Sequence, residues 1–236
     1  MCNTAVIPII IVLVCAVIFA SIYLFWRHVW FFRNPRRITP PEGTGILSPA
    51  DGTVVYVRRM MPQESVINIK RGMKATLNDI TREDINRPKI LIGIFMSPFN
   101  VHYNRMPVSG KISFIHHYPP LPENLCMLSM HLRTLLRCAP FYKNSAHIVI
   151  NERTVTKIDG QYRGRQIACY VVQIAAKSVS GIDVFMSEGT QASAGEIFGM
   201  IRIGSQVDLV VTPLEGMNVK VSPGEKVKAG QTVLIE

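Results

Sequence analysis

The chain contains three residues of the types that together can activate a hydroxyl nucleophile: Asp51, His102 and Ser205. Ser205 follows Gly204 and opens an alternating run over residues 206–211 that predicts a strand. An isolated Gly-Ser pair usually marks a turn or a bulge. A histidine that takes the serine proton, oriented by an aspartate, would instead make the hydroxyl a nucleophile. We therefore expect the chemistry of this chain at Ser205.

The two upstream residues also have purely structural explanations. Asp51 precedes Gly52, and Asp-Gly is a common hairpin turn. His102 follows an apolar run of strand length, residues 89–96, and a lone histidine in such a place is more often packed than catalytic. The surrounding residues decide between these interpretations.

Five segments of the chain, taken in order and spacing, resemble the phosphatidylserine decarboxylase family, and in particular its short single-domain branch. They are residues 30–35, 48–54, 97–110, 151–153 and 195–208. The resemblance covers nearly all of the chain after the N-terminal apolar run. Each segment alone is weakly specific, whereas five in the family's order form a specific pattern.

The resemblance implies a proenzyme that cuts itself between Gly204 and Ser205. The products would be a beta chain, 1–204, and an alpha chain, 205–236, held together as a heterodimer. Ser205 would become a covalent pyruvoyl group, whose ketone acts as an electron sink. Asp51 would orient the His102 imidazole, which would act as the base. The implied reaction is the decarboxylation of phosphatidylserine to phosphatidylethanolamine in phospholipid biosynthesis.

One position departs from the pattern of longer family members, which carry a second histidine three residues after the first. This chain has Arg105 there. His102 must then serve both self-cleavage and decarboxylation, or another group must help. Arg105 could instead bind the phosphate or carboxylate of the substrate.

The composition narrows the partner class. The chain has 236 residues, enough for one domain and an appendage, and 26 Lys and Arg against 16 Asp and Glu. A basic balance favours an anionic partner. No zinc-finger spacing, RNP-like motif or lysine-rich tail favours nucleic acid, so we expect a membrane and an anionic aminophospholipid. The five cysteines form no CxxC pair, which favours a reducing compartment and predicts no metal site.

Residues 5–26 carry no charge and are long enough to cross about 30 Å of hydrocarbon as a helix. No Lys or Arg precedes this run, which is atypical of a cleaved signal peptide. Arginines follow it, beginning at Arg27. The positive-inside rule then predicts an uncleaved anchor in the cytoplasmic membrane, with the decarboxylase domain, residues 27–236, in the cytoplasm.

The rest of the chain predicts a mainly β (α+β) fold with a few short helices. Strands are expected over residues 148–158, 165–175 and 207–211, and the tail, 219–231, resembles half of a lipoyl-type barrel-sandwich domain. Residues 58–88 are an excursion of unassigned role, with one or two helical turns within 76–84. Leucines at helical spacing within 121–137 predict a helix, packed on the core or lying at a lipid interface.

Two other functions stay open from the residues alone. A membrane-anchored hydrolase or peptidase would use the same Ser, His and Asp on external substrates, and its chain would stay intact. A non-catalytic, membrane-tethered barrel-sandwich module would also stay intact, and would tolerate loss of Ser205. The residues leave open the lipid tails (diacyl phosphatidylserine or ether-linked archaetidylserine) and whether the heterodimer pairs further into a homodimer.

Overall fold

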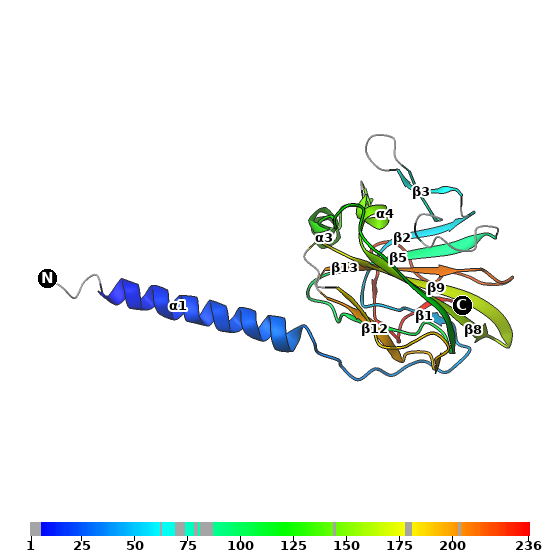
Figure 1. Ribbon diagram of the computed structural model, residues 1–236, viewed down its shortest axis with the longest axis horizontal. Coiled ribbons are helices and arrows are strands. Elements are labelled where there is room, and N and C mark those ends of the chain that lie inside the picture. The colour runs from blue at the N-terminus through cyan, green and yellow to red at the C-terminus, as the bar shows by residue number, and fades with distance from the viewer. Residues whose placement is uncertain are drawn as a thin grey trace. The chain divides into compact units, whose positions relative to one another are not determined.

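Two units make up the chain, Met1–Pro35 and Arg36–Glu236 (Figure 1). The structure, a computed structural model, describes residues 6–61, 63–68, 74–77, 80, 87–143, 145–177, 181–202 and 204–236. Of the predicted excursion over 58–88, residues 62, 69–73, 78–79 and 81–86 lie outside this description, as does most of the helix expected within 76–84.

The first unit is the expected apolar helix. Helix α1 spans Val6–Phe25 and continues into a π-helical stretch, η1, over Trp26–Trp30. The 24 residues Ile7–Trp30 are long and apolar enough to cross a membrane. No acidic residue lies in the first turn of α1 and no basic residue in its last turn, and basic Arg27 and His28 come only in η1.

Strands dominate the second unit, which confirms the mainly β fold class. The strands are β1 (Ile46–Leu47), β2 (Gly52–Met60), β3 (Ser65–Asn68), β4 (Lys74–Thr76), β5 (Lys89–Met96), β6 (Tyr103–Arg105), β7 (Gly110–Tyr118), β8 (Arg153–Tyr162), β9 (Arg165–Ala175), β10 (Ile182–Val184), β11 (Gln191–Ala192), β12 (Ile197–Ile201), β13 (Ser205–Val211), β14 (Lys226–Val227) and β15 (Val233–Ile235). Short helices accompany them, among them α3 (Leu128–Leu135) and α4 (His147–Ile150).

An eight-stranded antiparallel sheet forms the centre of this unit, in the order β11-β7-β8-β9-β13-β5-β2-β14. A three-stranded sheet, β10-β12-β6, and a pair, β1-β15, complete the site-bearing part of the fold. β13 pairs with β5 and β9 along its whole length. A strand paired on both sides is held more rigidly than an edge strand, so its first residue has a defined position.

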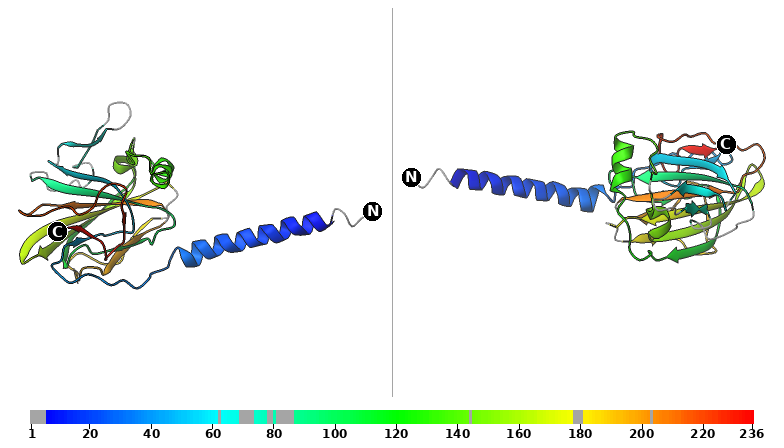
Figure 2. Two further views of the ribbon diagram at one scale, coloured as in Figure 1. Left: turned by 180° about the vertical axis from the view of Figure 1, so that it is seen from behind. Right: turned by 90° about the horizontal axis from the view of Figure 1, so that it is seen from above.

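The large sheet separates two apolar cores, as the alternation of side chains along its strands requires. One core joins odd-numbered residues of β13, such as Leu209, to β12 and β15. The other joins Val210 of β13 to Met130 of α3 and Ile148 of α4. Figures 1 and 2 show the same division, with α3 and α4 on one side of the sheet and β12 on the other.

Candidate active site

Ser205 is the first residue of β13, in the interior of the large sheet. It is fully buried and lies opposite Met96 of β5 and Ala175 of β9. The preceding Gly204 sits in a bend and has a φ of +64°. Glycine adopts this left-handed conformation without the steric cost of a Cβ. The backbone therefore bends at the Gly204–Ser205 peptide just before it enters the sheet.

The Ser205 hydroxyl has a weak hydrogen-bond partner. Its Oγ lies 3.4 Å from the sulfur of Met96, and a thioether is a poor acceptor. The Asn104 amide nitrogen points to the same sulfur at 3.8 Å and is held by Gln173, whose Nε2 donates to Asn104 Oδ1 at 2.8 Å. The serine proton is thus not committed to a strong acceptor. Sequence reasoning did not single out Met96 or Gln173, because both lie within ordinary strand patterns.

The chain sets the tautomer of His102. Its ring nitrogen Nδ1 lies 2.9 Å from the Asn100 carbonyl oxygen. A carbonyl oxygen only accepts, so Nδ1 carries the hydrogen and Nε2 is the nitrogen that can take up a proton. Asn100 is itself fixed, because its Oδ1 accepts from the backbone N–H and the hydroxyl of Ser97, each at 2.8 Å. His102 is fully buried, and its own turn therefore fixes the ring with Nε2 as the nitrogen that can accept a proton.

The connections that carry His102 and Ser205 meet at the same end of the fold. Residues 97–102 join β5 to β6, and residues 202–204 join β12 to β13. β5 pairs with β13 and β6 pairs with β12. The Ile201 N–H also donates to the His102 carbonyl at 3.3 Å. Because both flanking pairs are adjacent, the two connections are neighbours, and the structure brings the predicted base into the region of the predicted nucleophile.

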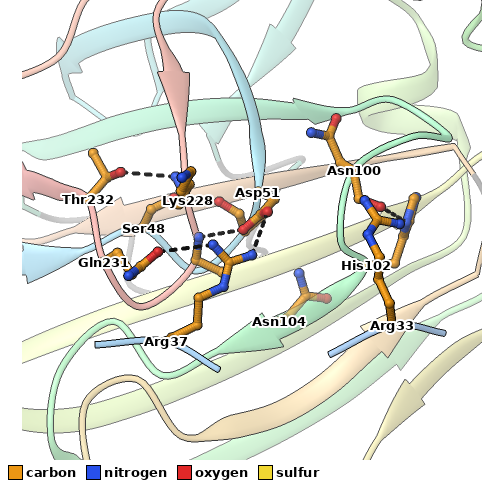
Figure 3. Close-up of polar contacts among 12 residues, drawn as sticks. Arg33, Arg37, Ser48, Asp51, Asn100, His102, Asn104, Lys228, Gln231 and Thr232 are labelled. Atoms are coloured by element: carbon orange, nitrogen blue, oxygen red, sulfur yellow. Dashed lines mark hydrogen bonds and ion pairs between the residues drawn. The ribbon is translucent and has the colours of Figure 1, made fainter. Parts of the chain in front are cut away.

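Asp51 is placed differently from the expectation that it orients His102. One carboxylate oxygen accepts from Arg37 Nη2 at 2.8 Å, and the other accepts from the Ala229 N–H at 2.7 Å. Arg37 also donates to Gln231 Oε1 at 3.1 Å. Figure 3 shows Asp51 facing Arg37, whereas the His102 ring faces Asn100. Within the described residues the hydrogen bonds of the Asp51 carboxylate go to Arg37 and Ala229, and none goes to His102.

Arg105 lies close to the same ion pair. Its Nη1 donates to the Gly195 carbonyl at 2.7 Å. Burial lowers its pKa, and so does the positive charge of Arg37, whereas Asp51 raises it. A guanidinium in this position adds positive charge beside Asp51. Whether Arg105 binds substrate stays a prediction.

The opposite face of β13 carries a buried polar network that sequence reasoning missed. Asp208 accepts from the Tyr56 hydroxyl at 2.8 Å and from Gln206 Nε2 at 2.7 Å. Gln206 Nε2 also lies 2.7 Å from the Tyr56 oxygen, and its Oε1 lies 3.0 Å from His147 Nε2. Since Oε1 only accepts, that histidine nitrogen carries hydrogen. All the side chains of this network are at least nine-tenths buried.

Burial controls the ionisation of this network. It raises the pKa of Asp208 to about 7, against the hydrogen bonds from Gln206 and Tyr56 and the charge of Arg153, which lower it. Burial also lowers the pKa of His147 to about 4. Tyr56 reaches Asp208 by crossing β5 over Gly93, where a Cβ would lie 2.4 Å from the tyrosine ring. The network therefore depends on a glycine that leaves room for the ring.

Metal ligands do not gather in the part of the chain that the structure describes. There, no group of three or more His, Cys, Asp or Glu side chains could hold a metal ion. Cys15, Cys126 and Cys138 are exposed free thiols, and Cys169 is a buried one. Ser205 as the carrier of a covalent cofactor stays a prediction.

Comparisons with known proteins agree with this reading of the chain. The family model for phosphatidylserine decarboxylase matches residues 24–235. A protein of Ruegeria pomeroyi is 35% identical over 88% of this chain and 77% of its own length. Proteins of Gluconobacter oxydans and Nitrosomonas eutropha are each 32% identical over 87% of this chain, and over 75% and 76% of their own lengths. All three relatives are named phosphatidylserine decarboxylase proenzyme.

Proposed function

The chain belongs to the phosphatidylserine decarboxylase family, and from this premise we propose that it is made as a proenzyme, cuts itself between Gly204 and Ser205, and then decarboxylates phosphatidylserine to phosphatidylethanolamine. The observation that carries the proposal is the geometry of that peptide. Gly204 has a positive φ and leads into a fully buried serine at the head of an interior strand.

Self-cleavage begins with proton transfer. His102 Nε2 takes the Ser205 hydroxyl proton, and Oγ attacks the Gly204 carbonyl carbon. Transfer of the Gly204 acyl group from nitrogen to oxygen converts the peptide into an ester and frees the Ser205 amine. A base then removes the Cα proton of residue 205, and the Gly204 carboxylate leaves. The dehydroalanine that results takes up water and loses ammonia, which leaves a pyruvoyl group at residue 205.

The fold suits a cut at this position. β13 pairs with β5 and β9, β14 with β2, and β15 with β1, and in each pair only the first strand named belongs to fragment 205–236. The alpha chain would thus stay bound to the beta chain through backbone ladders after the cut. The pyruvoyl ketone would supply the electron sink, which accepts the electrons of the bond between the substrate carbon and its carboxylate group. His102 can return a proton to the substrate carbon, and Arg105 supplies positive charge for an anionic head group.

The membrane arrangement follows from the first unit. We infer that residues 5–26 anchor the chain in the cytoplasmic membrane and that residues 27–236 form the decarboxylase domain on the cytoplasmic side. The arginines that follow the apolar run support this orientation. The substrate is an anionic aminophospholipid, either phosphatidylserine or its ether-linked counterpart, since the chemistry uses only the shared head group.

The test is intact-mass analysis of the purified chain and of single variants. The parent chain should yield fragments 1–204 and 205–236, the second with a blocked N-terminus that reacts with carbonyl reagents. Ser205→Ala, His102→Ala and Asp51→Ala should stay uncut. Asp51 would act through its ion pair, so Arg37→Ala should stay uncut as Asp51→Ala does.

His117→Ala is the matched control, because the His117 side chain is half-exposed and lies on β7 away from Ser205, and this variant should cut normally. A parent chain that stays intact with an ordinary serine at 205 would contradict the proposal. Hydrolysis of external esters or peptides by that intact chain would favour the hydrolase. Indifference of every measured activity to Ser205→Ala would favour the non-catalytic module.

A further inference from the structure

Helix α3 directs its leucines outward. Leu128, Leu132 and Leu135 recur at helical spacing and are 58%, 46% and 68% exposed. The helix packs on the core instead through Met127 and Met130, which are 4% and 0% exposed. A helix on a soluble domain normally buries its apolar stripe. An apolar stripe that the domain's own core leaves uncovered marks an interaction surface.

A cavity of about 490 Å³ opens beside this stripe, between α3 and the edge of the large sheet. Its walls include Leu135 and Phe99, which is 65% exposed, together with Arg137, Lys226 and Lys228. Asp51 is the sole acidic group among its described lining residues, and Arg37 neutralises it. Within the described chain, none of the three lining cations forms an ion pair.

The backbone at Arg137 is unusual. The residue follows the end of α3 with a φ of +54°, and the Cys138 N–H donates back to the Arg133 carbonyl at 2.9 Å. This arrangement is a Schellman motif, in which the left-handed position is usually glycine. A non-glycine residue there carries a conformational cost. The chain thus keeps a cation at the rim of the cavity where glycine would be more stable.

We propose that this α3 surface, formed by Phe99, Leu128, Leu132, Leu135, Arg137, Lys226 and Lys228, docks onto a leaflet that contains anionic phospholipid. The leucines insert among the acyl chains, and the three cations contact head-group phosphates and carboxylates. The inference rests on the proposed function only in that the substrate is a membrane phospholipid. The cavity reaches Asp51 and Asn100, the latter being the residue that orients His102.

Charge favours lipid over a second copy of the chain as the occupant. A symmetric pairing through this surface would bring the three cations of one copy toward those of the other, and like charges in contact oppose association. The whole chain has a net charge of +10. Anionic lipid both neutralises the cations and covers the leucines.

The experiment compares amide hydrogen exchange of the full chain in nanodiscs of phosphatidylcholine alone and of phosphatidylcholine mixed with phosphatidylglycerol, which is not a substrate. The anchor is embedded in both. In the anionic discs, exchange of residues 128–137 should slow by about tenfold, and added salt should reverse much of the effect. Equal exchange in the two discs would overturn the proposal. So would protection that grows with protein concentration in lipid-free detergent, which would assign the surface to a second copy.

Variants separate docking from folding. Arg137→Gly relieves the left-handed backbone, so its thermal midpoint should equal or exceed that of the parent, while the anionic effect on exchange drops about fivefold. The double variant Lys226→Gln, Lys228→Gln should lose still more. Lys111→Gln removes one charge, as Arg137→Gly does, at an exposed residue on β7; it is the matched control and should behave as the parent.

Intact-mass analysis of the same samples separates this proposal from the proposed function. Normal self-cleavage in all three variants, with the docking effect lost in the first two, is the expected result. A parent chain that docks but never cuts itself would refute the proposed function and leave the docking surface standing. A chain that cuts itself but shows no anionic effect would do the reverse.

Discussion

The polar side chains on the two faces of β13 differ in the strength of their hydrogen bonds. On one face the Ser205 hydroxyl contacts the Met96 sulfur, a weak acceptor. On the other, Gln206 and Asp208 share strong hydrogen bonds with Tyr56 and His147. A buried group with strong partners contributes to stability, whereas one with a weak partner stays available for proton transfer. Because side chains alternate between the two faces of a strand, β13 holds the reactive hydroxyl on one face and the stabilising network on the other.

The largest expected effect on folding comes from the network. In a His102→Ala background, which keeps the chain uncut, Asp208→Ala should lower the free energy of unfolding by about 2–4 kcal/mol, because Tyr56 and Gln206 lose a buried acceptor. Ser205→Ala in the same background is the matched variant on the other face, with the same replacement residue. Its loss of a weak contact should cost under about 1 kcal/mol. Urea unfolding in detergent measures both, and similar costs would break the distinction between the faces.

The next effect is on pH dependence. The folded-state pKa of Asp208 is raised from 3.8 to about 7, so between those values the folded chain keeps a proton that the unfolded chain has lost. Stability from this group therefore falls as pH rises through that window. The pKa of His147 is lowered from 6.5 to about 4. Across that window the unfolded chain binds the extra proton, so stability from His147 rises with pH.

The two slopes oppose one another between about pH 4 and pH 6.5, each reaching at most about 1.4 kcal/mol per pH unit. Asp208→Asn should leave only the rising slope, and His147→Gln only the falling one. Thermal unfolding of the uncut Ser205→Ala chain across this range measures the difference. Identical pH profiles in the two variants would show that neither group titrates in the folded state as described.

The sequence predicted the parts of this comparison that depend on local pattern. Alternation over 206–211 predicted a strand, and the resemblance to the family implied that His102 and Ser205 act in one site. The network could not be predicted, because Tyr56 and Asp208 lie far apart in the sequence and meet only through the pairing of β2, β5 and β13. An aspartate within an apolar run was the only available signal.

The ion pair of Asp51 and the packing of helix α3 also depended on tertiary structure. The Asp51–Arg37 ion pair forms because the tail brings the Ala229 N–H and Gln231 to the same place. The leucine spacing within 121–137 predicted a helix, but the side of that helix that faces the core was decided by Met127 and Met130. The helical spacing of apolar residues predicts a helix and its apolar stripe, but it does not predict what covers that stripe.

The smallest expected effect concerns Met96, whose sulfur is the weak hydrogen-bond acceptor of Ser205. Met96→Leu keeps the volume of the side chain and removes the sulfur, so stability should change by under about 1.5 kcal/mol. If the thioether merely fills space beside Ser205, self-cleavage should proceed within a few-fold of the parent rate, followed by intact mass after synthesis. Slowing by about tenfold, equivalent to about 1.4 kcal/mol in the barrier, would instead assign the sulfur a part in aligning the hydroxyl. Asn104→Ala, which removes the other donor to that sulfur, would then slow the reaction as well.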